Sequence, residues 1–221
     1  MEDIAKEKPF KFATRLHLLE LAGIRASTLS QLLQGIKKVP ASSIYYHTHA
    51  FFQEYQYLSR QSRNDIAFWV SEVVGETRLG EQLSKIDIMQ YSSIQELQEV
   101  IARTIEDYLK INKLAKFKFA HGNEAFHFIK SISFVLPTNF VAYNLKDMIE
   151  ILKKITLNSV YFHVFEARLR LKKPTNDFSA WINEVIGDKE LASNIALLNP
   201  YVSTLEDLRQ NIIRLIEKRI S

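Results

Sequence analysis

The sequence predicts a mainly α-helical protein built from two tandem homologous units, each with about five helices and a short opening strand. Three observations favour this fold class. The chain of 221 residues repeats itself, apolar residues recur at spacings of three and four, and glycine is scarce, with six residues. A chain of this length has room for two units of about 100 residues each.

The internal repeat is seen when the sequence is shifted by 116 residues. Residues 10–49 then align with residues 126–165 without a gap, so that SIYYH lies over SVYFH. The second copy next lacks four residues. After this gap, NDIAFWVSEVVG (64–75) aligns with NDFSAWINEVIG (176–187), and the match continues to the last helix. The chain therefore reads as a tandem duplication, which is the pattern of a repeat architecture.

The matches set the bounds of the two copies. We expect a first helical repeat unit at 8–112 and a second at 124–221, packed together as one body. Each copy opens with alternating apolar residues, FKFAT in the first and FHFIKSISF in the second, which is typical of a short strand. The two strands could pair with each other.

The segment STLSQLLQGIKK follows in the first copy and places four apolar residues on one helical face. Pro40 ends this helix, because proline lacks an amide hydrogen and restricts the residue before it. Ser42 or Ser43 then offers an N-cap for an aromatic-rich helix.

Polar residues and glycines mark the ends of the later helices in both copies. An asparagine–aspartate pair precedes each of two apolar helices, and each of these helices stops at a glycine. The final helices begin with S-x-x-E, which is a capping box, and with T-x-x-D, which is a near version with aspartate. The residues are Asn64, Asp65, Gly75, Ser93 and Glu96 in the first copy, and Asn176, Asp177, Gly187, Thr204 and Asp207 in the second.

The composition excludes several classes of function. The chain has no cysteine, which rules out disulfides, thiolate metal sites and cysteine nucleophiles. The N-terminus lacks the apolar core of a signal peptide, and no apolar run approaches the roughly 20 residues of a membrane helix. We expect a cytoplasmic protein that does not enter membranes and has no cofactor or metal.

Phosphate-loop, dinucleotide and nucleophile-elbow motifs are absent, which favours a non-enzymatic role.

The positive charge is concentrated in the second half. Residues 1–112 carry 13 Lys and Arg against 14 Asp and Glu, whereas residues 113–221 carry 16 against 11. This bias could reflect a solvated face, with Arg170 pairing with Glu166, or a patch for a phosphate backbone. The residues of this candidate nucleic-acid patch are Lys153, Lys154, Arg168, Arg170, Lys172 and Lys173.

Four strings carry a resemblance to a known family: SSIYYHTHAFF, NDIAFWVSEVVG, LPTNFVAYNL and SVYFHVFEARLRLKKPTNDFSAWI. They resemble a bacterial and archaeal family of unknown function, over nearly the whole chain from Phe10 to Ile220. The resemblance implies the duplication and its boundaries, and it implies no particular activity.

Two histidines stand out, His47 and His49. Residues two apart on a helix point about 200° apart, so these two side chains cannot grip one metal ion together. Phe165 replaces His49 in the second copy, which indicates a packing role. His47 recurs as His163, and two alternatives remain: a buried histidine that bonds a neighbouring helix, or an equivalent pair at a ligand or inter-unit site. The residues of that candidate site are His47, His163, Tyr45 and Tyr161.

These features favour a non-enzymatic scaffold that binds a protein partner, a second copy of itself or a ligand. The aromatic residues of the first copy surround almost the whole of one helix, so some of them are expected to face another surface. One alternative is a nucleic-acid-binding protein that uses the basic second half. A weaker alternative is an enzyme with His47 and His163 as acid–base groups in an inter-unit pocket.

Overall fold

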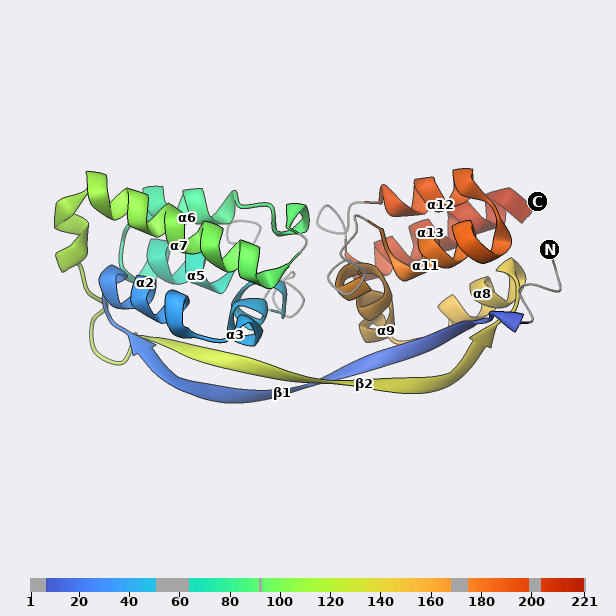
Figure 1. Cartoon of the computed structure of the whole chain (residues 1–221), viewed down its shortest axis with the longest axis horizontal. Coiled ribbons are helices and arrows are strands. Elements are labelled where there is room, and N and C mark those ends of the chain that lie inside the picture. The colour runs from blue at the N-terminus through green and yellow to red at the C-terminus, as the bar shows by residue number, and fades with distance from the viewer. Residues whose placement is uncertain (1–6, 51–63, 92, 168–174, 199–203, 221) are drawn as a thin grey trace. The chain divides into compact units, whose positions relative to one another are not determined.

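The structure, a computed structural model, describes residues 7–50, 64–91, 93–167, 175–198 and 204–220. Within these ranges it contains ten α-helices and one two-stranded antiparallel sheet (Figure 1). The strands are β1 (Phe10–Ala26) and β2 (Phe126–Ala142), each of 17 residues. They pair with each other, as the sequence suggested.

The described helices divide evenly between the two copies. The first copy holds α2 (Leu29–Lys38), α3 (Ala41–Tyr45), α5 (Asp65–Phe68), α6 (Thr77–Ser84) and α7 (Ile94–Ile111). The second copy holds α8 (Leu145–Leu152), α9 (Leu157–Tyr161), α11 (Asp177–Trp181), α12 (Lys189–Ala196) and α13 (Leu205–Ile220). Four helices continue directly into π-helical turns: η1 (Tyr46–Ala50), η2 (Trp69–Val73), η5 (Phe162–Glu166) and η6 (Ile182–Ile186).

The prediction of a mainly α fold with short opening strands was wrong, and the chain is not a purely helical repeat. The two strands are long, and they form a ribbon of their own. Apolar–polar alternation reveals a strand only where one face is buried. Here Phe10 and Phe12 are buried, but the adjacent residues Leu18 and Leu19 are both exposed, so the alternation is lost in the middle of β1.

The described contacts divide the chain into two compact bodies. We call His17–Ile132 the α2–α7 body, and Met1–Leu16 together with Ser133–Ser221 the α8–α13 body. The start of β1 therefore belongs to a body whose helices come from the second copy. The start of β2 likewise belongs to the body whose helices come from the first copy. The first residues of each strand therefore pack on the helices of the other copy, and we call the two strands exchanged.

The predicted helix ends are largely confirmed. Asn64 and Asn176 are N-caps whose side chains accept the amide hydrogens of Ala67 and Ser179. Ser93 caps α7, and Thr204 and Asp207 exchange two hydrogen bonds at the start of α13. Gly75 and Gly187 have positive φ angles of 73° and 80° after their helices. The expected cap of α3 was wrong, because the helix begins at Ala41 with Pro40 as its N-cap residue.

Each body buries aromatic residues from an exchanged strand against its helices. In the α8–α13 body, Phe10 stacks on Phe178 with ring centroids 5.2 Å apart. In the α2–α7 body, Phe128 lies so close to Gly35 that a Cβ atom there would be 2.2 Å from its ring. Aromatic burial of this kind is a large source of stability for a core.

Candidate functional site

His47, in η1 of the α2–α7 body, links three elements through both of its ring nitrogens. Its Nδ1 lies 2.6 Å from a carboxylate oxygen of Asp65, the first residue of α5. Its Nε2 accepts the backbone amide hydrogen of Ile129 in β2 at 2.9 Å. The side chain is 1% exposed. Because a carboxylate accepts and an amide donates, the ring is a neutral imidazole with its hydrogen on Nδ1.

His163, in η5 of the α8–α13 body, repeats this arrangement. Its Nδ1 lies 2.7 Å from a carboxylate oxygen of Asp177, and its Nε2 accepts the amide hydrogen of Ala13 in β1 at 2.9 Å. We call these two sets of residues the histidine bridges. Each bridge ties the strand that opens one copy to the helices of the other copy. A buried imidazole with both nitrogens occupied is typical of a structural role.

The sequence pointed to both aspartates, but only as residues at a helix start. Asp65 and Asp177 begin their helices, yet their carboxylates also hold the histidine rings. The sequence repeat contained a signal for this pairing, because both copies have the histidine and the aspartate at matching positions, His47 with Asp65 and His163 with Asp177. Their spacing of 18 and 14 residues concealed the pairing, because no single helix brings residues that far apart into contact.

The two tyrosines of the predicted site are core residues. Tyr45 stacks on His49 at 5.4 Å between centroids with an angle of 10°, and on His17 at 5.8 Å. Tyr161 stacks on Phe165 at 4.5 Å with an angle of 18°. His47 and Tyr45 belong to one body and His163 and Tyr161 to the other. A ligand or inter-unit site at these residues stays a prediction.

His49 is enclosed by protein and differs from His47 in its surroundings. Its Nδ1 lies 3.0 Å from the hydroxyl oxygen of Thr48, which itself donates to the carbonyl oxygen of Ile44. The hydroxyl has one hydrogen, so it accepts from Nδ1–H of His49. Burial lowers the pKa of His49 from 6.5 to about 4, because the charged imidazolium would lose its hydration.

The candidate nucleic-acid patch lies largely outside the described residues, because Arg168, Arg170, Lys172 and Lys173 fall in the gap at 168–174. Lys153 lies within 4 Å of two carboxylates, at 3.6 Å from Glu150 and 3.5 Å from Glu217. Glu166, for which the sequence suggested Arg170 as a partner, forms an ion pair with Arg15 of β1. Nucleic-acid binding by the second half stays a prediction.

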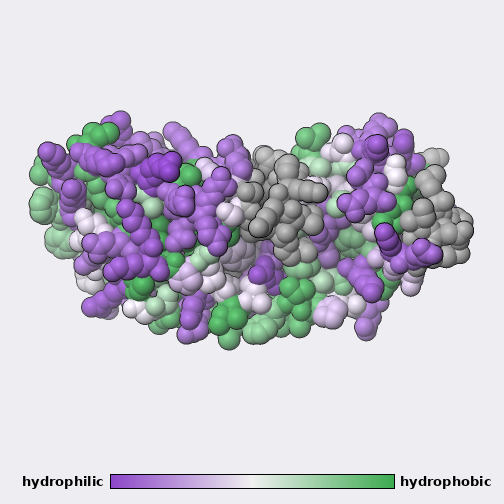
Figure 2. All heavy atoms as spheres, viewed as in Figure 1, coloured by the Kyte–Doolittle hydropathy of each residue, from purple (hydrophilic) through white to green (hydrophobic). Residues whose placement is uncertain are grey.

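The ribbon of β1 and β2 carries an unusual number of exposed apolar side chains. Nine of the 17 large exposed apolar residues in the described part of the chain lie on these two strands. Figure 2 shows apolar side chains gathered where Figure 1 places the ribbon. We call these nine residues the ribbon surface: Leu16, Leu18, Leu19, Leu21, Ile132, Phe134, Val135, Leu136 and Phe140.

Glu20 is the only Asp, Glu, Lys or Arg residue between Leu16 and Leu21, and segment 132–140 has none. Lys130 of β2 lies 3.2 Å from the carboxylate of Glu20 of β1. Leu18 and Leu19 are consecutive in β1, so their side chains point to opposite faces and the nine residues are divided between both faces of the ribbon. Exposed apolar patches mark interaction sites in soluble proteins more often than isolated exposed leucines do. The sequence motifs HLLEL (17–21) and SFVLP (133–137) contain six of the nine residues, but no periodic pattern distinguished them from buried core.

None of the helices in the described ranges combines the length and the apolar character needed to cross a membrane.

Comparisons with known proteins add the fold and the family. A solved structure, that of OrfY from Thermoproteus tenax, is similar over 96% of this chain and 95% of that chain, with a TM-score of 0.81. The two sequences are 23% identical, so the likeness shows a shared fold alone. No curated protein matches the sequence. The family described as a family of unknown function (DUF5752) matches residues 7–217, and the chain therefore belongs to the DUF5752 family.

Proposed function

We propose that this protein is a non-enzymatic binding scaffold and that it self-associates through the ribbon surface. The observation that carries the proposal is the exposure of the nine apolar side chains on β1 and β2, with Leu18 and Phe134 57% and 51% exposed. A scaffold role is also supported by the histidine bridges. Their ring nitrogens are occupied by protein groups, so neither ring offers a free lone pair for acid–base chemistry.

The occupant of the ribbon surface is a second copy of this chain. In a two-fold interface the same patch lies against itself, so a net charge on the patch would meet the same net charge on its partner. The two segments that carry the ribbon surface, 16–21 and 132–140, contain one acidic residue, Glu20, which pairs with the adjacent Lys130. Face-to-face packing also suits the strand chemistry, since Pro137 lacks the amide hydrogen that edge-to-edge pairing would use.

The apolar area is sufficient for a reversible interface. Complete burial of one leucine or phenylalanine side chain contributes roughly 1.5–3 kcal/mol. Side chains that are about half exposed would therefore add about 1 kcal/mol each when covered. Association also removes translational and rotational freedom, which costs roughly 4–15 kcal/mol. We therefore expect a dissociation constant in the micromolar rather than the nanomolar range.

The test is sedimentation equilibrium of the full chain from micromolar to hundreds of micromolar. We expect association for the wild type and loss of association for Leu18→Glu and for Phe134→Glu, because each places a charge inside the interface. Leu114→Glu is the matched control, since Leu114 is 82% exposed but lies off the strands. A wild type that stays monomeric, or a control that dissociates as much as the strand variants, would overturn the proposal.

A further inference from the structure

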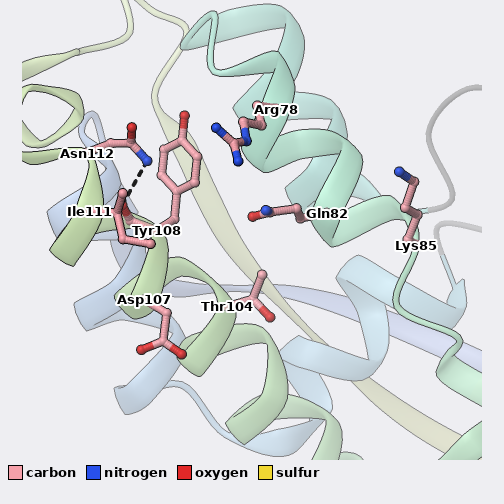
Figure 3. A pocket seen from close by; sticks show the side chains of 8 residues that line it. All are labelled: Arg78, Gln82, Lys85, Thr104, Asp107, Tyr108, Ile111 and Asn112. Carbon is pink, nitrogen blue, oxygen red and sulfur yellow. Dashed lines mark hydrogen bonds between the residues drawn. The ribbon is translucent and has the colours of Figure 1, made fainter.

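A groove in the α2–α7 body lies between α6 and α7 and has a volume of about 460 Å³ (Figure 3). This volume falls within the range of roughly 300–1,000 Å³ that is usual for small-molecule sites. Arg78, Gln82 and Lys85 line it from the side of α6, at spacings that place them on one face of the helix. Thr104 and Asp107 line it from α7, together with Tyr108.

The duplication supplies an internal comparison for this groove. In the α8–α13 body, the space between α12 and α13 measures about 140 Å³. The repeat alignment places Glu190 at the position of Arg78, and Arg219 at the position of Tyr108. Both residues line the smaller groove. The same backbone arrangement therefore carries different side chains in the two copies.

Arg219 forms two ion pairs at the second-copy groove. Arg219 reaches Asp188 at 2.5 Å and Glu190 at 3.6 Å, so its charge is satisfied within the groove. These pairs hold α13 to the residues at the start of α12.

The first copy keeps a contact between the positions of Arg219 and Asp188, but in the described ranges it lacks the ion pair that Glu190 forms in the second copy. The hydroxyl of Tyr108 donates to Glu76, the counterpart of Asp188, and Glu76 also pairs with Lys118 at 2.8 Å. Burial and this hydrogen bond raise the pKa of Tyr108 to about 12, so the ring remains a neutral wall of the groove. Arg78 takes part in no ion pair within the described ranges and is exposed to the groove.

We infer that the α6–α7 groove binds a small phosphate monoester. The guanidinium of Arg78 presents paired donors that match phosphate oxygens, and Lys85 adds a second positive charge two turns along the same face. The α7 side offers acceptors instead. Asp107 pairs with Lys110 through one carboxylate oxygen at 2.9 Å and has a second oxygen, and the hydroxyl oxygen of Thr104 can accept because its hydrogen is donated to Val100. These acceptors suit an organic part that carries hydroxyl groups. This inference is independent of the ribbon surface.

The test is a titration followed by amide NMR shifts and calorimetry, with glycerol 3-phosphate as the probe. We expect binding that shifts amides of α6 and α7, weaker binding of inorganic phosphate, and none of glycerol. Arg78→Ala should weaken glycerol 3-phosphate binding by roughly tenfold or more, since charge-assisted hydrogen bonds are lost. Asp107→Asn should reduce the preference for glycerol 3-phosphate over inorganic phosphate, because the carboxylate that accepts from the hydroxyl groups is removed.

The matched control is Lys189→Ala, which removes one positive charge at the start of α12, in the α8–α13 body. It should bind as the wild type does, and melting temperatures should show that all variants are folded. The inference is overturned if glycerol 3-phosphate does not bind at millimolar concentration, or if glycerol binds equally well. Equal weakening by Lys189→Ala would show general charge attraction instead of a site, and would also overturn it.

Discussion

Replacing His49 by phenylalanine should remove a large part of the acid sensitivity of the α2–α7 body. The chain itself suggests the substitution, because Phe165 stands at the equivalent position of the second copy and stacks on Tyr161 as His49 stacks on Tyr45. The geometry of the site therefore already accepts an aromatic hydrocarbon ring in one copy.

The magnitude follows from the lowered pKa of His49. The folded protein holds the ring neutral down to pH of about 4, whereas the unfolded chain binds a proton near 6.5. Between these values the unfolded state binds more protons, so the free energy of unfolding falls as the pH is lowered. Each tenfold difference in proton affinity is worth about 1.4 kcal/mol, which gives roughly 2 kcal/mol at pH 5 and roughly 3 kcal/mol below pH 4.

The assay is urea unfolding followed by tryptophan fluorescence at pH 7.5, 6, 5 and 4.5. We expect wild type and His49→Phe to differ little at pH 7.5 and the variant to become more stable by about 2 kcal/mol at pH 5. Carboxylates titrate equally in both proteins and cancel in the difference. The reverse substitution, Phe165→His, should introduce a similar acid sensitivity. Parallel stability curves for wild type and His49→Phe would refute the reasoning.

Two further substitutions test the core. His47→Ala should lower the free energy of unfolding by roughly 2–3 kcal/mol, because the Ile129 amide and the Asp65 carboxylate both lose a partner. Chemical denaturation measures this change. An unchanged midpoint of unfolding would contradict the structural role of the histidine bridge. Gly35→Ala should also destabilise, by about 1–3 kcal/mol, because the new methyl group would meet the Phe128 ring at 2.2 Å. A stabilised Gly35→Ala protein would show that the ring can move aside and that helix propensity decides the outcome.

Local features of this protein were readable from the sequence. Asn64 and Ser93 cap helices, and Gly75 ends one, as their residue types predict. These structures depend on hydrogen bonds and steric limits that act within a few residues of each other. The duplication was equally visible, because a repeat is a property of the sequence alone.

The groove illustrates an intermediate case. The alignment of the two copies already placed Arg78 over Glu190 and Tyr108 over Arg219, so the difference in chemistry was present in the sequence. What the sequence did not show was that these residues line one space between two helices. That fact depends on how the helices pack, which a helical pattern does not specify.

The exchanged strands were decided only by the tertiary structure. FKF and FHF open the two copies with the same apolar residues, so either strand could fill either helical core with nearly the same contacts. The sequence by itself determined the duplication, the caps and the helical faces, because those depend on neighbours along the chain. The pairing of His163 with Ala13 joins residues 150 positions apart. Local propensity cannot choose between two nearly equal partners at that separation, and only the packing of the whole chain selects one.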